Sequence, residues 1–280
     1  MAHAVDARIS DVLALRKCDG NDAKRHLGRS GDGLLRHMES DPVCDHRSYD
    51  WPYPVPPRSP DVISRMIACN DLCKSYTHGG NRKRVLENVT FTVERGERLA
   101  LLGRNGAGKS TLIKLIGGVE LPTSGKILRH MSVSWPLGFS GGFQGSLTGY
   151  DNTRFIARIY KRDYIQVRSF VEEFTELGRQ LKIPVKNYSS GMRARLAFAL
   201  SLAIEFDCYL IDEIILVGDQ NFARKCREEL FEKRSDRTMI IASHSTDIIS
   251  ELCNKALIIH NDHASMSDDV DESIKTYLNL

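Results

Sequence analysis

The stretch GRNGAGKST, which runs from Gly103 to Thr111, is the most informative part of this sequence of 280 residues. It matches the pattern G-x-x-x-x-G-K-[S/T], in which glycines let backbone N–H groups close around a phosphate chain. The preceding LALLG has the composition of a buried strand, and the following KSTLIKLIGG that of a short helix whose dipole favours an anion. We therefore predict a phosphate loop, with Lys109 neutralising the β- and γ-phosphates and Ser110 binding Mg²⁺.

Two carboxylates follow a second apolar run, FDCYLIDE. The residues from Cys208 to Ile211 are those of a buried strand, so Asp212 and Glu213 are expected at the carboxyl edge of a sheet, where ligands bind in such folds. Asp212 is predicted to reach Mg²⁺ or its water, and Glu213 to polarise an attacking water. The alternative is a solvated acidic strand end, which the presence of the phosphate loop disfavours.

Four weaker features each have an ordinary alternative. His244 follows the apolar run IIAS and could contact a γ-phosphate or could be a packed or solvated histidine. Gln144 lies in a glycine-rich loop and, without the other motifs, is better read as an ordinary polar loop residue. Tyr76 is expected on a loop before the second strand and alone indicates nothing. The turn Ser189-Ser190-Gly191 opens a helix in YSSGMRARLAFALSLA, and it could be a plain N-cap or an anion-binding site.

The remainder of the chain from Met66 alternates between strand and helix patterns. This order indicates an α/β fold with a largely parallel sheet covered by helices. Gly178 is expected to cap the helix that begins near Tyr164. The expected strands are 67–72, 88–103, 208–212, 238–243 and 255–260, and the expected helices are 109–118, 146–160, 164–178, 190–203, 221–234, 246–253 and 271–280.

Residues 1–65 differ in composition from the rest. They hold six of the nine prolines, with ten Lys/Arg and ten Asp/Glu, and are expected to be mostly disordered. The simplest hypothesis is that Met66 is the natural start and that 1–65 is upstream sequence; the alternative is a tether that binds a partner. The segment also contains four potential zinc ligands whose spacing fits none of the usual zinc patterns: Cys18, His26, Cys44 and His46.

The overall composition is that of a globular protein, with 41% hydrophobic and 27% charged residues. The longest apolar run, Leu196 to Ile204, is nine residues long, whereas a membrane span needs roughly 20. No secretory signal is visible, and seven scattered cysteines fit reduced thiols in a cytosol. The net charge of +3 is too small to indicate nucleic acid as a partner.

The order and spacing of these motifs, from Tyr76 through the phosphate loop to His244, resemble an ATP-binding cassette (ABC) nucleotide-binding domain over about residues 66–280. The resemblance implies a mostly parallel core sheet with a small antiparallel β subdomain and a helical subdomain. It implies that Tyr76 stacks on adenine, that Glu213 is the general base and that His244 contacts the γ-phosphate. The loop residues that would bind ATP are Gly103, Arg104, Asn105, Gly106, Ala107, Gly108, Lys109, Ser110 and Thr111.

The same resemblance assigns the remaining positions. Gln144 would contact ATP and sense Mg²⁺, together with the Mg²⁺ ligands Ser110 and Asp212, and would also sense a membrane subunit; Asp219 would bridge a homodimer. The turn at the helix start would be the family's signature motif, which caps the γ-phosphate of ATP held by the opposite subunit. Its residues would be Ser189, Ser190, Gly191 and Met192.

The sequence YSSGM departs from the commonest signature, L-S-G-G-Q, and is similar to that of polysaccharide exporters. The stretches SVSWPLGFSGGFQGSLTGYDN and LVGDQNF look like the capsular polysaccharide export ATPases. The resemblance implies an ATPase at the cytoplasmic face of the inner membrane, paired with a separate integral membrane permease and handling polysaccharide. O-antigen or teichoic-acid export is the alternative, although 36 residues after His244 leave no room for an added carbohydrate-binding domain. A cytosolic non-transport ABC ATPase and an inactive cassette are less favoured.

Overall fold

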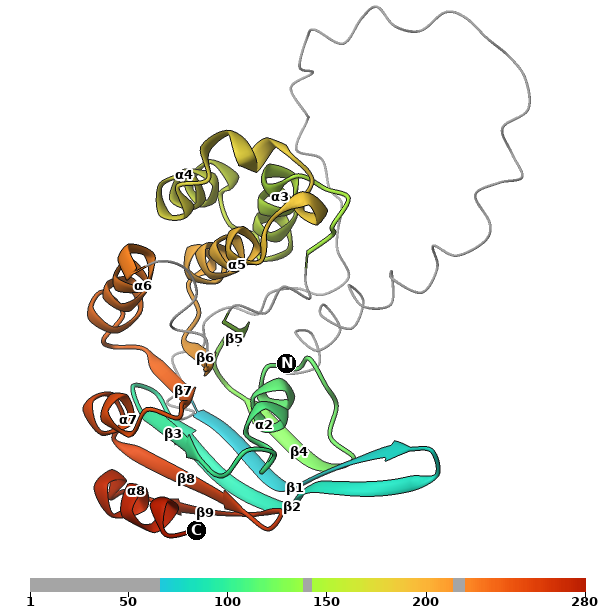
Figure 1. Ribbon diagram of the computed structural model, residues 1–280, viewed down its shortest axis with the longest axis vertical. Coiled ribbons are helices and arrows are strands. Elements are labelled where there is room, and N and C mark those ends of the chain that lie inside the picture. The colour runs from blue at the N-terminus through green and yellow to red at the C-terminus, as the bar shows by residue number, and fades with distance from the viewer. Residues whose placement is uncertain (1–65, 138–142, 214–219) are drawn as a thin grey trace, which may run out of the picture.

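Two sheets and a group of helices make up the part of the chain that the computed structural model describes, residues 66–137, 143–213 and 220–280 (Figure 1). Helices α3 (Gly149–Ile159), α4 (Tyr164–Thr175) and α5 (Ser190–Ile204) lie together at one end of the molecule in this view. The segment 1–65 with its four potential zinc ligands lies outside the described residues, and so does Asp219. The predicted fold class is confirmed.

The larger sheet has six strands in the order β5-β6-β7-β3-β8-β9. Five of them run parallel, because helices or longer segments connect them, and β9 pairs antiparallel with β8 at the edge. The strands are β3 (Arg98–Leu102), β5 (Val133–Pro136), β6 (Cys208–Asp212), β7 (Thr238–Ala242), β8 (Lys255–His260) and β9 (His263–Ser267).

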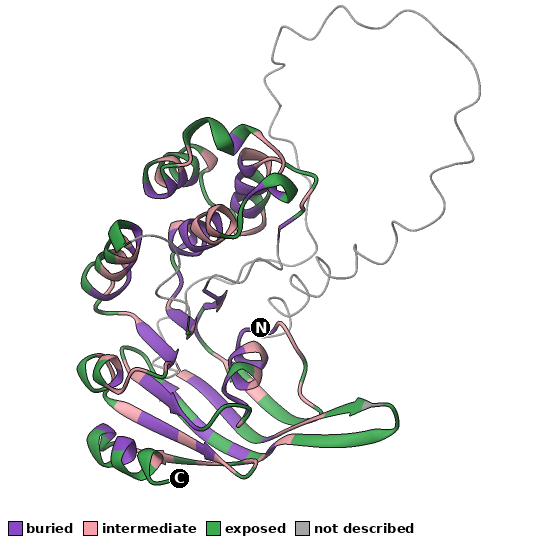
Figure 2. Cartoon of the chain, viewed as in Figure 1, coloured by how far each residue is buried: buried purple, intermediate pink, exposed green. Residues whose placement is uncertain are grey.

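Both faces of this sheet are covered, as the buried strands of Figure 2 show. In β3, Leu99 and Leu101 pack toward α2 (Lys109–Ile116) and the smaller sheet. The alternate residues Ala100 and Leu102 pack in the cluster of Ile249 and Ile274, from α7 (Thr246–Leu252) and α8 (Val270–Leu278). This period of two places apolar side chains on both faces, which explains why the sequence of the strand is a continuous apolar run.

The smaller sheet is antiparallel, with the order β2-β1-β4. Its strands are β1 (Met66–His78), β2 (Asn81–Glu94) and β4 (Ser124–Arg129). One face packs on the larger sheet and α2 through Leu86 and through Val89, Phe91 and Val93, which alternate along β2 after an irregularity in the register. The far end of the β1–β2 hairpin projects from the body and is exposed (Figure 2).

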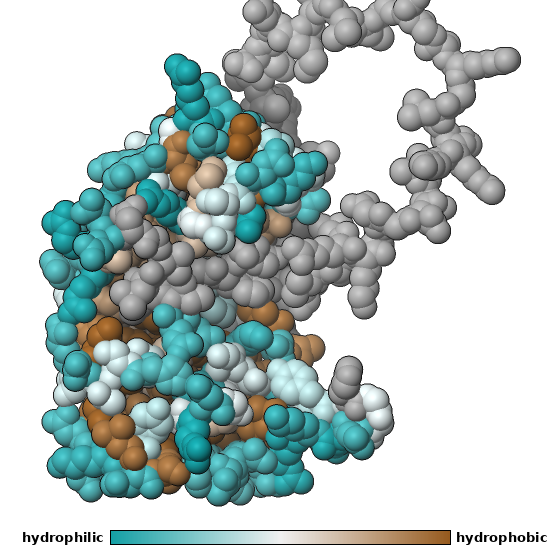
Figure 3. Space-filling model, viewed as in Figure 1, coloured by the Kyte–Doolittle hydropathy of each residue, from teal (hydrophilic) through white to brown (hydrophobic). Residues whose placement is uncertain are grey.

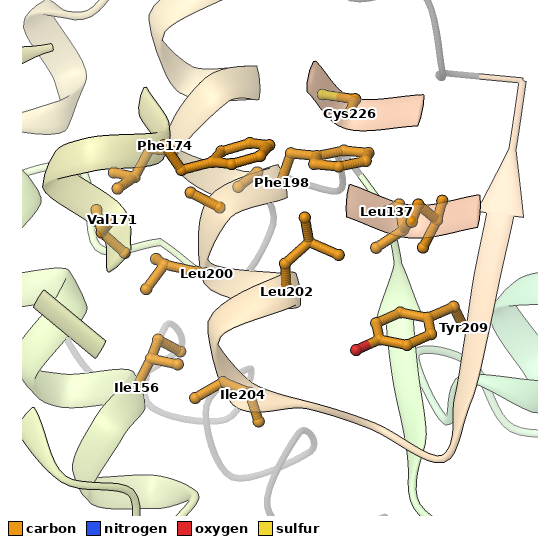
Figure 4. Packing of buried hydrophobic residues seen from close by; sticks show 14 of the residues in the cluster. Leu137, Ile156, Val171, Phe174, Phe198, Leu200, Leu202, Ile204, Tyr209 and Cys226 are labelled. Carbon is orange, nitrogen blue, oxygen red and sulfur yellow. The ribbon is translucent and has the colours of Figure 1, made fainter. Parts of the chain in front are cut away.

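The helical unit consists of α3 (Gly149–Ile159), α4 (Tyr164–Thr175) and α5 (Ser190–Ile204). Phe174 of α4 stacks on Phe198 of α5 with ring centroids 6.0 Å apart, and Leu200 and Ile204 fill the same core (Figure 4). Tyr209 of β6 belongs to this cluster too, so the unit and the large sheet share one core. The other helices are α6 (Gln220–Arg227), α7 (Thr246–Leu252) and α8 (Val270–Leu278).

The face of the molecule in Figure 3 is mostly hydrophilic, with hydrophobic side chains in separate patches. Such a mixture is normal for protein surfaces. Among the described helices, none has the length and apolar character that crossing a bilayer requires.

Several expectations about elements are wrong in detail. Helix α4 ends at Thr175, where Glu176 adopts a left-handed conformation with φ 56°, so Gly178 does not cap it but begins the short helix η2 (Gly178–Lys182). The helix expected over 221–234 is instead α6 followed by a wider π-helical turn, η5 (Glu228–Glu232). Three strands were not predicted: β4, β5 and β9.

Candidate active site

A pocket of about 330 Å³ lies at the carboxyl edge of the parallel strands β3, β6 and β7. Ligands bind at this edge in open α/β sheets, and the volume is within the usual range for a small-molecule site. Most of the predicted site residues meet here. The pocket is lined by Tyr76, Lys83, Val85, Asn105, Gly106, Gly108, Lys109, Ser110, Thr111, Asp212, Glu213, Ala242 and His244.

The phosphate loop connects β3 to the first turn of α2, as predicted. Gly108 stands before the helix with φ 109°, and a Cβ there would approach Val85 to 3.0 Å, so this position requires glycine. Lys109 is buried, and its ammonium donates hydrogen bonds to the carbonyl oxygens of Gly103 at 2.5 Å and Arg104 at 3.3 Å. Burial lowers the pKa of Lys109, while the charges of Glu213 and Asp212 act in the opposite direction.

The hydroxyl of Ser110 lies 3.1 Å from Oδ1 of Asp212, to which it donates a hydrogen bond. Asp212 is the last residue of β6 and pairs with Ala242 of β7, so the parallel ladder fixes its backbone at the pocket. A serine hydroxyl and a carboxylate are hard oxygen ligands that fit Mg²⁺, which also takes phosphate oxygens and water. The residues present therefore fit an ATP-bound Mg²⁺.

Glu213 and His244 form a pair at the same edge. Nε2 of His244 lies 2.6 Å from Oε1 of Glu213, and the two side chains are 42% and 55% exposed. Glu213 has φ 56°, an unfavourable region for a residue with a Cβ, while its N–H donates to the carbonyl of Ala242 at 3.0 Å. This bend at the end of β6 places a solvent-accessible carboxylate beside the phosphate loop, where it could accept a proton from water.

Tyr76 lies within β1 rather than on the loop that the sequence suggested, because the hairpin continues to His78 before it turns. Its hydroxyl donates to Oε2 of Glu120 at 2.5 Å. The ammonium of Lys74 lies 4.9 Å from the ring centroid and 3.2 Å from Oε2 of the same glutamate. These contacts hold Tyr76, a residue that is 39% exposed, at the border of the pocket.

Three lining residues were missed by the sequence reasoning: Lys83, Val85 and Ala242. Lys83 is paired with Tyr76 across the hairpin of β1 and β2. The signal that could have found it is the Gly79-Gly80 turn, where both residues have positive φ, as a two-residue hairpin turn requires. Counting back from that turn pairs His78 with Asn81 and so Tyr76 with Lys83.

Other predicted residues lie away from the pocket. Gln144 is exposed and is joined through its backbone to the side chain of Asn152, with N–H to Oδ1 at 3.0 Å. Ser189 is the N-cap of α5, and its hydroxyl oxygen accepts from the N–H of Met192 at 3.2 Å. Ser189 and Ser190 are exposed at the end of the helix, so this turn is presented outward from the single chain. Of the loop residues, Gly103, Arg104 and Ala107 do not line the pocket.

A phosphate loop after β3, a carboxylate pair after β6 and a histidine after β7 define the chain as a nucleotide-hydrolysing cassette. The model of the ABC transporter family matches residues 86–215. The capsule polysaccharide export ATP-binding protein CtrD of Neisseria meningitidis serogroup B is 56% identical over 215 residues, which cover 77% of this chain and 100% of that protein. The chain therefore belongs to the ABC transporter ATP-binding proteins, in the family that includes the capsule polysaccharide export ATPases.

Other relatives agree with this placement. The polysialic acid transport ATP-binding protein KpsT of Escherichia coli is 46% identical over 76% of this chain and 98% of its own. The teichoic acids export ATP-binding protein TagH of Staphylococcus haemolyticus is 40% identical over 69% of this chain and 74% of its own.

Solved structures show the same fold. An ATP-binding subunit of an ABC transporter is 26% identical, with a TM-score of 0.64 over 76% of this chain and 94% of its own. A dimeric cassette in a post-hydrolysis state, bound to ADP and Pi, is 17% identical, with a TM-score of 0.61 over 72% of this chain and 98% of its own.

Proposed function

We propose that the chain is the ATP-hydrolysing subunit of an exporter that moves capsular or related cell-surface polysaccharide across the inner membrane. The observation that carries this proposal is the 56% identity to a capsule export ATP-binding protein over the whole length of that relative. Export of teichoic acid or O-antigen is the second candidate, and the lower identity of 40% to the teichoic acid relative ranks it below capsule export. This function involves no nucleic acid as a partner.

In the proposed reaction, each group of the pocket has one task. Lys109 holds the β- and γ-phosphates, and Tyr76 stacks on the adenine. Ser110 and Asp212 would hold Mg²⁺, which would supply positive charge against the phosphate oxygens. Glu213 takes a proton from the attacking water, and His244, 2.6 Å away, orients the carboxylate and contacts the γ-phosphate.

The active form in this proposal is a homodimer with two ATP sites between the subunits. Each site combines the phosphate loop of one subunit with the signature turn (residues 189–192) of the other. The exposure of Ser189 and Ser190 supports this arrangement, because the turn is free to meet a partner. The dimeric cassette that shares the fold supports it as well. Asp219 is proposed to bridge the two subunits, and Gln144 to contact the metal and the permease.

Mixed subunits test the shared site. Ser189→Arg disables the signature turn by replacing its exposed serine with a bulky side chain, and Lys109→Ala removes the ammonium that holds the phosphates. Each homodimer should therefore be inactive. Mixing the two variants creates dimers with one complete site. ATPase activity should then return to at most the level that one site per dimer supports. If each variant alone hydrolyses ATP, or if the mixture stays inactive while both variants are folded, the shared site is wrong.

The transport role requires a separate membrane permease, with the chain bound peripherally at the cytoplasmic face of the inner membrane. It is tested by complementing a deletion strain and measuring polysaccharide inside and outside the cell. The wild-type chain should restore surface polymer, whereas Glu213→Gln should leave polymer inside. Glu232→Gln, the same chemical change at an exposed position of η5, is the matched control and should export normally. Normal export by the Glu213 variant would contradict the proposal, and the permease is identified by co-purification from detergent-solubilised membranes.

We also propose that the ATPase unit spans residues 66–280. This stretch has 215 residues, which equals the length over which the Neisseria relative is matched from end to end.

A further inference from the structure

Tyr188 stands directly before the signature turn, at the position where the commonest signature has leucine. Its side chain is buried, with 3% exposed, and its hydroxyl donates to the carbonyl of Gln180 at 2.8 Å. The hydroxyl also receives a hydrogen bond from the backbone of Gly149, the first residue of α3. In addition, Nη1 of Arg193 donates to the carbonyl of Tyr188 at 2.5 Å. One side chain thus joins the turn, η2 and the start of α3, and leucine would make neither hydroxyl contact.

Gly149 leaves the space that the hydroxyl of Tyr188 occupies. A Cβ at position 149 would overlap the hydroxyl oxygen of Tyr188 and would lie 2.9 Å from Cδ2 of Leu181. The beginning of α3 is otherwise fixed by a capping box between Thr148 and Asp151, so the helix has little freedom to move aside. The absence of a side chain at Gly149 is therefore what allows the hydroxyl of Tyr188 to reach the backbone of Gly149 itself.

A second set of hydrogen bonds, between backbone groups, joins the segment before Ser189 to the segment before α3. The N–H of Val185 donates to the carbonyl of Leu147 at 2.9 Å, and the N–H of Lys186 donates to Gly145 at 2.8 Å. Residues 145–148 thus form a short ladder with 184–186, and Gln144 at the head of this segment is tied to α3 through Asn152. The segment after Gln144 and the segment before Ser189 consequently form one hydrogen-bonded unit.

We propose that Tyr188 is a positioning residue: its buried hydroxyl fixes the signature turn to the start of α3 and to the segment after Gln144, so that Ser189 is presented to ATP in the partner subunit. The inference rests on the proposed shared ATP site. Ser189 has a backbone conformation of φ −62° and ψ 165°, and its hydroxyl oxygen accepts the N–H of Met192. Ser189 itself is exposed and its hydrogen bonds are to Met192 and Arg193 of α5, so the adjacent Tyr188 is the nearest buried side chain in the sequence that can hold it.

The test uses Tyr188→Phe in the Glu213→Gln background, in which ATP-bound dimers should persist. The dimer dissociation constant at saturating Mg-ATP should rise about tenfold, while ATP affinity measured at concentrations too low for dimers should be unchanged. Tyr209→Phe is the matched control, since Tyr209 is also fully buried and its hydroxyl accepts a backbone N–H at 3.3 Å, from Phe206. It removes the same group and should leave dimer affinity as it was. Equal weakening by the two variants, or no weakening by the first, overturns the inference.

Mixed dimers separate positioning from a general loss of structure. In a dimer of Lys109→Ala and Ser189→Arg subunits, the complete site uses the signature turn of the Lys109→Ala subunit. Tyr188→Phe added to that subunit should lower ATPase activity about tenfold, whereas the same change in the Ser189→Arg subunit should have no effect. A loss of the same size in both placements overturns the proposal.

The outcomes also distinguish this inference from the proposed function. If the parent Glu213→Gln protein does not dimerise with ATP, the shared site itself fails and the role of Tyr188 fails with it. If the parent dimerises and Tyr188→Phe dimerises equally well, only the role of Tyr188 is wrong. Gly149→Ala gives a further test. Its added Cβ would overlap the hydroxyl oxygen of Tyr188, so the single variant should impair dimerisation more than the double variant with Tyr188→Phe, which lacks that oxygen.

Discussion

Replacing Glu213 by glutamine removes a proton acceptor while keeping the shape of the side chain and its backbone position. Loss of a general base typically costs a factor of about 10² to 10⁴ in rate, or about 3 to 5 kcal/mol in the activation barrier. We expect kcat for ATP to fall within this range. ATP binding should survive. Lys109 keeps its hydrogen bond to the carbonyl oxygen of Gly103, and the negative charge of Asp212 still acts on the Lys109 ammonium.

The effect on folding should be small by comparison. The carboxylate of Glu213 is 55% exposed and its partner His244 is 42% exposed, and such solvent-accessible pairs contribute at most about 1 kcal/mol. Glutamine and glutamate have similar costs at the positive φ of this position, so the backbone adds no difference. A stable protein that binds ATP and barely hydrolyses it is therefore the expected phenotype.

The assay is steady-state phosphate release together with ATP binding to the isolated monomer. A double-mutant cycle with His244→Ala shows whether the pair acts as a unit. His244→Ala alone should slow turnover at least about tenfold, and the double variant should be about as slow as Glu213→Gln alone, since residues acting as one unit are not additive. Hydrolysis by Glu213→Gln at the wild-type rate, with Glu232→Gln as the control, would show that this carboxylate is not the base.

Four further changes test other parts of the site. Asp212→Asn should raise the Mg²⁺ concentration for half-maximal ATPase activity about tenfold, and an unchanged Mg²⁺ titration would remove Asp212 from the metal site. Tyr76→Ala should raise KM for ATP about tenfold or more with little change in kcat, in line with about 1–3 kcal/mol for base stacking; an unaltered KM would exclude stacking. Ser189→Asp should keep the melting temperature, because Asp caps helices as well as Ser, yet abolish ATP-driven dimerisation by repelling the γ-phosphate. The fragment 66–280 should match the full chain in melting temperature and ATPase rate, and recovery of the peptide HMESDPVCDHR from untagged cells by mass spectrometry would contradict a start at Met66.

The sequence was sufficient for the parts of the site that follow buried strands. Lys109, Asp212 and His244 each come after an apolar run, and the carboxyl ends of parallel strands necessarily meet at one edge of the sheet. Strand type and chain order therefore place these residues together without knowledge of side-chain packing. Lys83 follows from a different rule, since the register of the β1–β2 hairpin is counted from the Gly79-Gly80 turn, and the sequence reasoning missed Lys83 because it did not identify that turn.

The end of α4 shows a second limit. Glycine is the usual residue for a left-handed helix end, which made Gly178 the natural candidate. The structure places Glu176 in that conformation, and the ammonium of Lys225 from α6 donates to the carbonyl of Glu173 at 2.8 Å and to Oε1 of Glu176 at 3.0 Å. These contacts between residues some fifty positions apart offset the local cost, and no local pattern in the sequence reveals them.

The signature turn raised a choice between a helix cap and a phosphate site, and the geometry of Ser189 makes the two compatible. A serine hydroxyl carries one donor and two acceptor lone pairs. In the single chain, one lone pair accepts the N–H of Met192 at 3.2 Å, so the cap leaves the O–H donor available. A phosphate oxygen accepts hydrogen bonds, so it needs the donor that capping does not use. The cap therefore leaves the exposed O–H of Ser189 able to donate to a phosphate oxygen, so capping and the proposed phosphate recognition do not exclude each other.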